Sequence, residues 1–440
     1  MTSLAGTTLT AAGSPLTAAL GPTDPDAPHL AVNVVGLRCR ACDATAPVGP
    51  THVCSECFGP LEVAYDDAAI AARVSRARIE AGPRSLWRYG DLLPVLSEDP
   101  ATRIDLGTGA TPLRPAPRLA ARLGLGELWL KDDTRNPSGS FKDRVVTIAL
   151  SAARALGIET LACASTGNLA TSVAAHAAAA GMPAYVVVPS DLERAKIAGS
   201  AIHGAQVIAV DGSYDDVNRL CAELTDVLGW GFVNINLRPF YAEGSKTIGF
   251  EIAEQLGWEL PDHVVGPIAS GAMFVRVHEA FAQLRRLGLV ADPRTPRFSG
   301  AQATGCSPVA TAFEHDTFEV VPQRPDTIAR SLAIGNPADG EEALRVVAAT
   351  GGAVGHVPDE EIVAAIGLLA ETEGLFAETA GGVTIANLVR FARQGHVGRD
   401  ERVVAIISGN GYKTLDAVVD AVGPRATIAP SLDAFIRAVG

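Results

Sequence analysis

Residues 136–144 read NPSGSFKDR and place Lys142 between a tight turn of small residues and an apolar run. Pro137 fixes its own backbone angle and disfavours the helical region for the residue before it, while Gly139 permits a positive φ. The apolar run over 145–152 is too continuous for a surface helix. We therefore predict a helix that begins at this turn and is interior over its first turns.

Lys142 stands where a side-chain amine is partly desolvated and next to the positive end of a helix dipole. Both conditions favour the neutral amine, which is the nucleophile that a Schiff base with an aldehyde cofactor requires. The alternative is that Lys142 pairs with Asp143 on a solvated helix start, and for a lysine taken alone that interpretation is preferred. The turn indicates a reactive amine only in combination with three loops farther along the chain.

Composition restricts the classes of function. The chain has 440 residues, is 48% hydrophobic and carries a formal net charge of −13, which argues against nucleic acid as a general partner. Residues 1–37 contain no Lys or Arg, and no uninterrupted apolar stretch is long enough for a bilayer, so we expect a cytoplasmic protein without membrane contact. Residues 1–30 are rich in Thr, Ala, Gly and Pro and predict a flexible tail.

Four cysteines near the amino terminus form two CxxC pairs separated by eleven residues, Cys39 with Cys42 and Cys54 with Cys57. Two such knuckles bring four thiolates to one tetrahedral zinc ion, and a four-cysteine site is structural because no position stays open for water. The alternatives are two disulfides, which a reducing compartment disfavours, or a site that has lost its metal. We predict a zinc-ribbon-like unit over residues 31–66.

The main body alternates short apolar runs with helical patterns of ten or more residues, which predicts an α/β fold with a parallel sheet covered on both faces. The predicted strands are residues 161–164, 184–188, 206–210, 231–235, 264–269, 298–303 and 403–408. Ligands of such sheets bind beyond the carboxyl ends of the strands, so the following loops are expected to carry the function.

Three of those loops have residues suited to binding a ligand. The STGN sequence at 165–168 opens a helix and could bind a carboxylate, although Ser, Thr and Asn are also ordinary helix caps. The ASGA sequence at 269–272 could cradle a cofactor phosphate with backbone N–H groups. Ser408 ends the last strand, where its hydroxyl could face a ring nitrogen or serve the turn.

Together and in this order, five stretches of the chain resemble the fold-type II family of pyridoxal-phosphate enzymes, and within it most closely the threonine synthases. They are NPSGSFKDR, ASTGNLATSVAAHAAAAGMPAYVVVP, EGSKTIGFE, PIASGAM and AIISGNGYK. The resemblance covers roughly residues 106–414, and a CxxC pair also accompanies some threonine synthases. It implies two doubly wound parallel-sheet domains beside the ribbon, a large cofactor-binding one over 67–155 and 250–430 and a small one over 156–249.

The resemblance also implies roles for individual residues. Lys142 holds pyridoxal phosphate as a Schiff base and serves as the catalytic group. The other implied cofactor contacts are Phe141 beside the ring, Asn168 at the ring hydroxyl, Ile268, Ala269, Ser270, Gly271 and Ala272 at the phosphate, and Ser408 at the pyridine nitrogen. The implied contacts of the substrate carboxylate are Ser165, Thr166 and Gly167. A neutral hydroxyl at the pyridine nitrogen does not enforce its protonation.

The reaction that the resemblance implies converts the phosphorylated amino acid O-phosphohomoserine and water to threonine and phosphate. The amine of Lys142 removes the Cα proton, phosphate leaves from Cγ and water adds at Cβ, which requires one base that reaches more than one carbon.

The chain departs from the family pattern at two positions of the site and in the cofactor-phosphate loop, which is less rich in Gly and Asn than the usual pattern. Leu169 replaces a threonine that many members have, and Tyr241 aligns with an arginine that holds the substrate phosphate in some members. By position alone, Asn236, Arg238 or Lys246 could supply that phosphate contact.

Two further readings stay open, the first of them because of Leu169 and Tyr241. One is a related β-replacement synthase that acts on O-phosphoserine, similar to cysteate synthase. The other is a zinc-ribbon binding module attached to an inactive body. Large apolar α/β enzymes often pair, which leaves a homodimer as an option.

Overall fold

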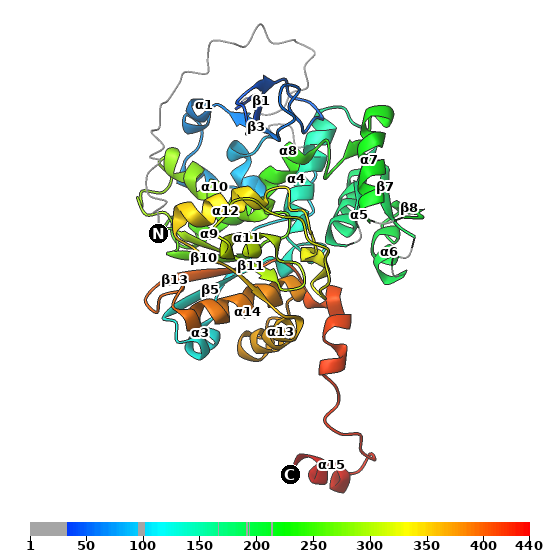
Figure 1. Ribbon diagram of the computed structural model, residues 1–440, viewed down its shortest axis with the longest axis vertical. Coiled ribbons are helices and arrows are strands. Elements are labelled where there is room, and N and C mark those ends of the chain that lie inside the picture. Colours follow the sequence, from blue (N-terminus) through cyan, green and yellow to red (C-terminus); the bar gives the residue numbers. More distant parts are fainter. Residues whose placement is uncertain (1–32, 96–101, 166, 191, 193, 213) are drawn as a thin grey trace.

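The computed structural model describes residues 33–440 except 96–101, 166, 191, 193 and 213 (Figure 1). The predicted tail over residues 1–30 lies outside the described residues. Within the described part of the chain, no helix has the length and apolar character needed to span a bilayer.

The larger of the two α/β sheets has six strands in the order β12-β11-β10-β13-β5-β4. Their bounds are β12 Val354–Val357, β11 Arg297–Ala303, β10 His263–Pro267, β13 Arg402–Ile407, β5 Glu127–Asp132 and β4 Leu113–Pro115. Neighbouring strands are parallel except for the edge strand β4, which is antiparallel to β5. The predicted parallel sheet is confirmed, and the sequence interpretation missed β4, β5 and β12.

Helices cover both faces of this sheet (Figure 1). In β13, Val404 packs into one core and its neighbours Val403 and Ala405 pack into the other, as the two-residue period of a strand requires. One face carries α9 Lys246–Gln255, α10 Ala272–Arg286, α11 Pro308–Glu314 and α12 Gly340–Thr350. The other face carries α3 Pro117–Leu123, α13 Asp359–Glu373 and α14 Thr379–Gln394.

The smaller sheet has four parallel strands in the order β8-β7-β6-β9. Its elements are β6 Leu161–Ala164, α5 Asn168–Ala180, β7 Ala184–Pro189, α6 Arg194–Ala201, β8 Gln206–Val210, α7 Tyr214–Leu228 and β9 Gly231–Phe232. All four strands fall within the stretch 156–249 that we assigned to a small domain, although the domain boundaries themselves stay a prediction.

Two helices lie between the sheets and contact each other, α4 Lys142–Ala155 and α8 Arg238–Gly244 (Figure 1). Every residue of α4 from Asp143 to Ala153 is buried, which agrees with the interior helix predicted from its apolar run. The short helical turn η3 Asp133–Arg135 precedes it and η4 Arg330–Leu332 lies between α11 and α12.

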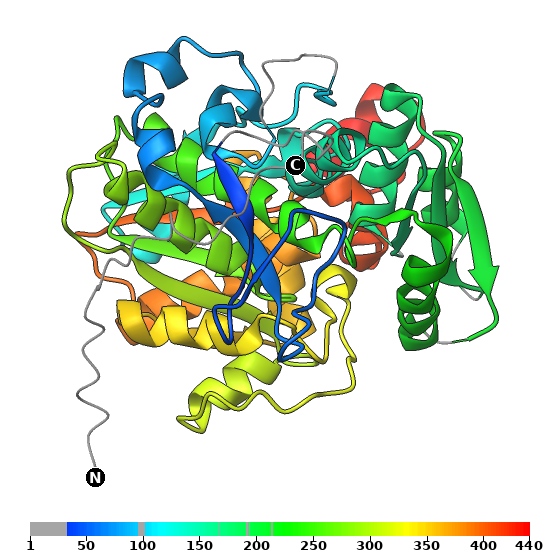
Figure 2. The same cartoon turned by 90° about the horizontal axis from the view of Figure 1, so that it is seen from above.

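The amino-terminal unit is a three-stranded antiparallel sheet in the order β2-β1-β3, seen from above in Figure 2. Its strands are β1 Val34–Cys39, β2 Thr45–Ala46 and β3 Leu61–Tyr65, followed by α1 Asp67–Ala71, α2 Arg76–Glu80 and η2 Leu86–Leu92. The link that follows the sheet is divided into the two short helices α1 and α2, because Ser75 adopts an extended conformation and its side chain caps α2.

The carboxyl-terminal segment leaves the body as η5 Gly411–Ala417, η6 Val419–Ala421 and α15 Leu432–Val439. Helix α15 stands away from both sheets in Figure 1, and none of its residues is buried.

Candidate functional site

The lysine turn is held against the loop that follows β13. Gly139 has a φ of 78°, a region that glycine adopts without strain. The N–H of Phe141 donates to the carbonyl of Ser408 at 2.8 Å, and the N–H of Asn410 donates to the carbonyl of Gly139 at 2.9 Å. Two loops that are far apart in sequence therefore form one wall of the site.

Asp143 holds the lysine turn in place and does not pair with Lys142. Its buried carboxylate accepts hydrogen bonds at 2.6 Å from the N–H of Ser138, the hydroxyl of Ser138 and the hydroxyl of Ser172 on α5. A solvated Lys142–Asp143 pair, the alternative that the sequence left open, is not what the structure contains.

Lys142 is half-buried between two aromatic rings. Its Nζ donates to the hydroxyl of Tyr241 at 2.6 Å and lies 4.8 Å from the ring centroid of Phe141 and 5.3 Å from that of Tyr241. Tyr241 is carried by α8. The sequence marked this tyrosine only as a departure from the family pattern and did not anticipate its contact with the lysine.

The chain has few other lysines, at positions 131, 196, 246 and 413. Lys131 and Lys246 form ion pairs at 2.6 Å with Glu251 and Glu243. Lys413 donates to the carbonyl of Ser138 at 2.8 Å. Lys246 also lies over an aromatic ring, 4.7 Å from the centroid of Tyr65. Among the lysine side chains that the structure describes, Lys142 is the one that combines ring contacts with a neutral hydroxyl partner in place of a carboxylate.

A second polar cluster joins Asn168 and Ser408 through Glu378. The Asn168 Nδ2 donates to Glu378 Oε2 at 2.8 Å, and the Ser408 hydroxyl donates to Glu378 Oε1 at 3.2 Å. Gly409 has no room for a side chain, because a Cβ there would overlap the same carboxylate. Two residues that the sequence assigned to the cofactor ring thus share one buried acid.

Sequence reasoning missed Glu378. It lies 210 residues after Asn168 and 30 residues before Ser408, outside every motif that we identified. Burial raises the pKa of Glu378 above its usual range, although the hydrogen bond from Asn168 works in the opposite direction. No short sequence pattern could have revealed it, since its partners meet only in the folded chain.

The predicted carboxylate loop opens α5. Ser165 is buried and its hydroxyl accepts from the N–H groups of Gly167 and Ala170, both at 3.3 Å. Ser165 therefore satisfies one N–H of the first turn of α5, while the N-cap position itself is Gly167. Gly167 is exposed, and Thr166 lies outside the described residues. Leu169, the departure from the family pattern, is buried.

The predicted phosphate loop connects β10 to α10 at the same edge of the sheet as Ser408, because β10 and β13 are neighbours. Ile268 is buried and donates from its N–H to the carbonyl of Ala301 at 2.9 Å. The carbonyl of Ser270 accepts from the N–H of Asp339 at 2.8 Å. Residues Ala269, Ser270, Gly271 and Ala272 then lead into the amino-terminal end of α10. A helix start of this kind binds anions through its backbone N–H groups.

The three residues predicted to contact the substrate phosphate have other partners. The Asn236 amide bonds to the backbone of its own loop, accepting from Phe232 N at 2.8 Å and donating to Trp230 O at 2.9 Å. Arg238 pairs with Asp339 at 2.6 Å, in a crevice between the ribbon and the body. The structure does not bring any of these side chains into contact with Lys142.

Lys246 makes the third of these alternative contacts, the ion pair with Glu243, and both side chains are buried. The spacing of three residues on adjoining helical turns could have suggested this pair from sequence. A phosphate contact by Lys246 would require the ammonium to leave that partner.

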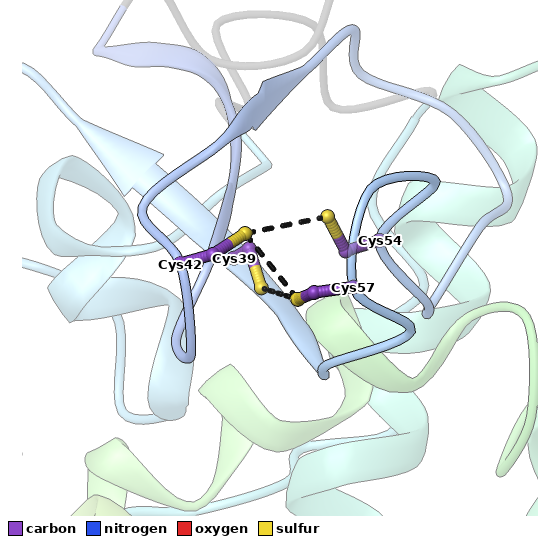
Figure 3. Close-up of side chains that lie close together, drawn as sticks. All are labelled: Cys39, Cys42, Cys54 and Cys57. Carbon is purple, nitrogen blue, oxygen red and sulfur yellow. Dashed lines mark hydrogen bonds between the residues drawn. The ribbon is translucent and has the colours of Figure 1, made fainter.

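The four predicted zinc ligands come together between β1 and β3, as Figure 3 shows. All four sulfur atoms lie within 4.8 Å of one another, with Cys42 and Cys57 exposed and Cys39 and Cys54 buried. The shortest sulfur–sulfur distance is 3.3 Å, from Cys57 to Cys42, far longer than a disulfide bond. All seven cysteines of the chain are described and none forms a disulfide. The arrangement matches the donor set of a tetrahedral zinc ion.

The residues around Lys142 also fit an aldehyde cofactor that carries a phosphate. A half-buried amine faces aromatic rings, the half-buried Asn168 and the buried Ser408 supply polar groups beyond it, and a helix start follows the neighbouring strand. The hydroxyl of Ser140, next to Phe141, is buried and has no hydrogen-bond partner within the described residues. A buried polar atom without a partner is unusual and is consistent with a ligand-binding role.

Comparisons with known proteins agree with this chemistry. Residues 104–409 match the family model described as pyridoxal-phosphate dependent enzyme. The chain is 37% identical to the threonine synthase of Methanocaldococcus jannaschii, covering 87% of this chain and 94% of that relative. It is 35% identical to the threonine synthase of Methanosarcina acetivorans, covering 92% of this chain and 98% of that relative.

Solved structures show the same fold at lower identity. Threonine deaminase isoform 2 of Solanum lycopersicum has a TM-score of 0.58 and 23% identity, covering 71% of this chain and 88% of its own. Diaminopropionate ammonia lyase of Escherichia coli has a TM-score of 0.59 and 19% identity, covering 72% of this chain and 88% of its own.

Proposed function

We propose that this chain, which belongs to the threonine synthase family of pyridoxal-phosphate-dependent enzymes, converts O-phosphohomoserine and water to threonine and phosphate. The observation that carries the proposal is Lys142, which stands in the family's lysine turn with its amine between Phe141 and Tyr241. Within the described residues it forms no ion pair, so its amine is available for covalent chemistry.

The cofactor contacts follow from the two walls of the site. Pyridoxal phosphate, when bound, supplies an electron sink for the negative charge that develops at the substrate Cα. We assign Phe141 to the ring face and Asn168 to the ring hydroxyl. Ser408 is assigned to the pyridine nitrogen, and the loop from Ile268 to Ala272 to the phosphate.

Lys142 is the proposed proton carrier. Its side chain has four methylene groups, so the free amine can move between the substrate carbons while α4 stays in place. Proton transfer needs hydrogen-bond distance at each carbon, which a rigid base could not provide at both. The Tyr241 hydroxyl lies 2.6 Å from this amine and can hold it between transfers.

The substrate carboxylate is assigned to the amino-terminal end of α5, at Ser165, Thr166 and Gly167. For the substrate phosphate, Arg238 and Lys246 remain the proposed cations, and each would have to exchange a carboxylate partner for the phosphate. Arg238→Ala is expected to raise KM for the phosphorylated substrate with little change in kcat. An unchanged KM would contradict that assignment.

The decisive test of the function is phosphate release by the holoenzyme with two substrates, O-phosphohomoserine and O-phosphoserine. One methylene changes where the leaving group must sit, so the two are not interchangeable in one site. Threonine formed from the first substrate is the expected result. Release from O-phosphoserine alone would favour the β-replacement alternative.

The cysteine cluster is proposed as a structural zinc site. Purified protein is expected to contain about one zinc ion per chain, and Cys39→Ser to lose it, because a four-thiolate site needs every ligand. Cys221→Ser, a buried cysteine outside the cluster, is the matched control and is expected to keep the metal. Equal metal content in both variants would contradict the proposal. The homodimer and the cytoplasmic location stay predictions.

A further inference from the structure

Asp339 is a buried carboxylate that touches the predicted phosphate loop and lines the crevice between the ribbon and the body. It precedes α12, yet its side chain does not cap that helix. Its backbone N–H donates to the carbonyl of Ser270 at 2.8 Å. Its two carboxylate oxygens pair with different cations, Arg40 at 2.9 Å and Arg238 at 2.6 Å. Asp339 therefore connects the phosphate loop to side chains from two other parts of the chain.

The contact between Asp339 and the phosphate loop is close. Gly271, which precedes α10, has a φ of 91°, and a Cβ there would lie 2.5 Å from the carbonyl oxygen of Asp339. The backbone of Asp339 thus contacts two consecutive residues of the loop, Ser270 and Gly271. Because the backbone N–H groups at the start of α10 follow directly, a shift of Asp339 would change where those groups point.

Arg40 belongs to the ribbon and lies inside its first CxxC pair, between Cys39 and Cys42. Its backbone N–H donates to the carbonyl of Pro60 at 3.0 Å, which ties it to the start of β3. Its guanidinium leaves the ribbon and meets the carboxylate of Asp339. The knuckle whose thiolates would bind a zinc ion therefore also sets the position of the side chain that holds Asp339.

A second set of contacts joins the ribbon to the helices behind the loop. Glu62 on β3 pairs with Arg40 at 3.3 Å and with Arg276 on α10 at 2.8 Å. The hydroxyl of Tyr65, also on β3, donates to Glu243 on α8 at 2.6 Å. Arg276 and Glu243 are buried, and a buried charge is costly to leave without its partner. The ribbon thus holds α10 as well as the loop that opens it.

We propose that the ribbon supports the cofactor-phosphate loop and that Asp339 is the positioning residue through which it acts. When the four thiolates close on one zinc ion, the knuckle holds Arg40, Arg40 holds Asp339, and Asp339 holds the phosphate loop. The inference rests on the proposed function, which places the cofactor phosphate at this loop. It gives a metal site that has no open position for chemistry an effect on cofactor affinity.

Coupling of this kind acts in both directions. If zinc raises the affinity for pyridoxal phosphate by some factor, the bound cofactor raises the affinity for zinc by the same factor. Coupled sites commonly change each other's affinity by about 5-fold to 150-fold. We expect metal-free protein to bind the cofactor roughly 10-fold more weakly than zinc-loaded protein.

The test is an absorbance titration of cofactor-free protein with pyridoxal phosphate, carried out with zinc bound and after removal of zinc by a chelator. Arg40→Gln removes the charge that holds Asp339 and keeps all four thiolates. This variant is expected to retain its zinc, to bind the cofactor roughly 10-fold more weakly than the wild type, and to lose no further affinity when zinc is removed. Arg40→Lys keeps a cation and is expected to recover part of the affinity.

Arg38→Gln is the matched control, because Arg38 lies on the same strand and pairs with Asp43 inside the ribbon at 3.5 Å, with both side chains exposed. It is expected to keep the full effect of zinc. The ³¹P resonance of the bound cofactor is expected to shift in Arg40→Gln and to stay in place in Arg38→Gln. A purely structural defect would lower the amount of folded protein without moving the resonance of the cofactor that is bound.

Equal cofactor affinity with and without zinc would overturn the inference, and so would protein that binds no zinc. A full zinc effect in Arg40→Gln would overturn the route through Asp339. Wild-type protein that forms no visible cofactor band would instead overturn the proposed function on which the inference rests.

Discussion

The lysine end of the site and the ring-nitrogen end hold their polar groups in different ways. Lys142 is half-buried and its amine meets one neutral partner, the hydroxyl of Tyr241. Glu378 is fully enclosed and bonded to Asn168 and Ser408 at once. The difference indicates a division of tasks, because a proton carrier must move and the groups that set the ring electronics must not.

The helix that carries this mobile amine is nevertheless held in place by buried ion pairs. Arg144, two residues along α4, is fully buried and pairs with Asp133 and Glu251, both at 2.6 Å. Glu251 also pairs with Lys131. Freedom at the lysine end is thus confined to the side chain of Lys142.

The largest effect is expected at the lysine itself. Lys142→Ala removes the proposed proton carrier, so we expect phosphate release from O-phosphohomoserine to fall by roughly 10³-fold or more. Lys413→Met is the control, a nearby lysine outside the proposed linkage, and it is expected to keep the visible cofactor band. Turnover by Lys142→Ala near that of the wild type would contradict the division of tasks.

The buried ion pairs that hold α4 in place can be tested through the stability of the fold. Burial opposes ionisation of Glu251, but the charges of Arg144 and Lys131 outweigh it and lower the pKa of Glu251 to about 2. The unfolded value is about 4.3, so this stabilisation is complete above that pH and is lost as the pH falls toward 2.

Glu251→Gln is expected to lower the free energy of unfolding by about 3 kcal/mol at neutral pH, because it leaves the buried Lys131 without its carboxylate and Arg144 with Asp133 alone. It is also expected to weaken the loss of stability below about pH 4.3. Urea denaturation at a series of pH values measures both effects. An identical acid slope in wild type and variant would show that Glu251 is not held ionised.

The contacts of Glu378 at the ring-nitrogen end of the site can be disrupted without replacing a polar residue. Gly409→Ala places a methyl group where the carboxylate of Glu378 lies, so the acid must move and lose its bonds. We expect a cost of about 2 kcal/mol, which is roughly a 30-fold weaker cofactor affinity. Gly367→Ala on α13, where a Cβ meets open space, is the control in the same absorbance titration. Equal cofactor affinities would mean that the ring-nitrogen end of the site tolerates displacement of Glu378.

The smallest effect is expected at Tyr241. Tyr241→Phe removes the hydroxyl that contacts Lys142 and keeps the aromatic ring. The loss of one hydrogen bond corresponds to about 1 kcal/mol, so we expect kcat to fall roughly 5-fold with an intact visible band. A kcat equal to that of the wild type would show that the amine needs no partner between proton transfers.

The sequence predicted the parts of the molecule whose structure is determined by residues close together in the chain. The turn at 136–144 and the strands β6, β7 and β8 follow from residue types and short periods, and the structure has them at the expected places. Strand β5 was missed because it ends in Lys131 and Asp132, charges that suggest a loop. Both are buried here, because Glu251 on a distant helix pairs with Lys131 and Arg114 on the edge strand pairs with Asp132.

The same distinction between local and distant causes explains the site. Lys142 lies in a motif that can be read from nine consecutive residues. Glu378 acquires its role only through partners from two other elements, and Tyr241 only because α8 packs against α4. Contacts between segments that are distant in sequence leave no pattern in a single chain.

The most direct test of the central claim is chemical trapping of the cofactor on its lysine. The holoenzyme would be reduced with borohydride, digested and analysed by peptide mass spectrometry across the lysines at 131, 142, 196, 246 and 413. We predict the mass of the reduced cofactor on the peptide that contains Lys142. The same mass on a peptide with another lysine, or on none, would contradict the account.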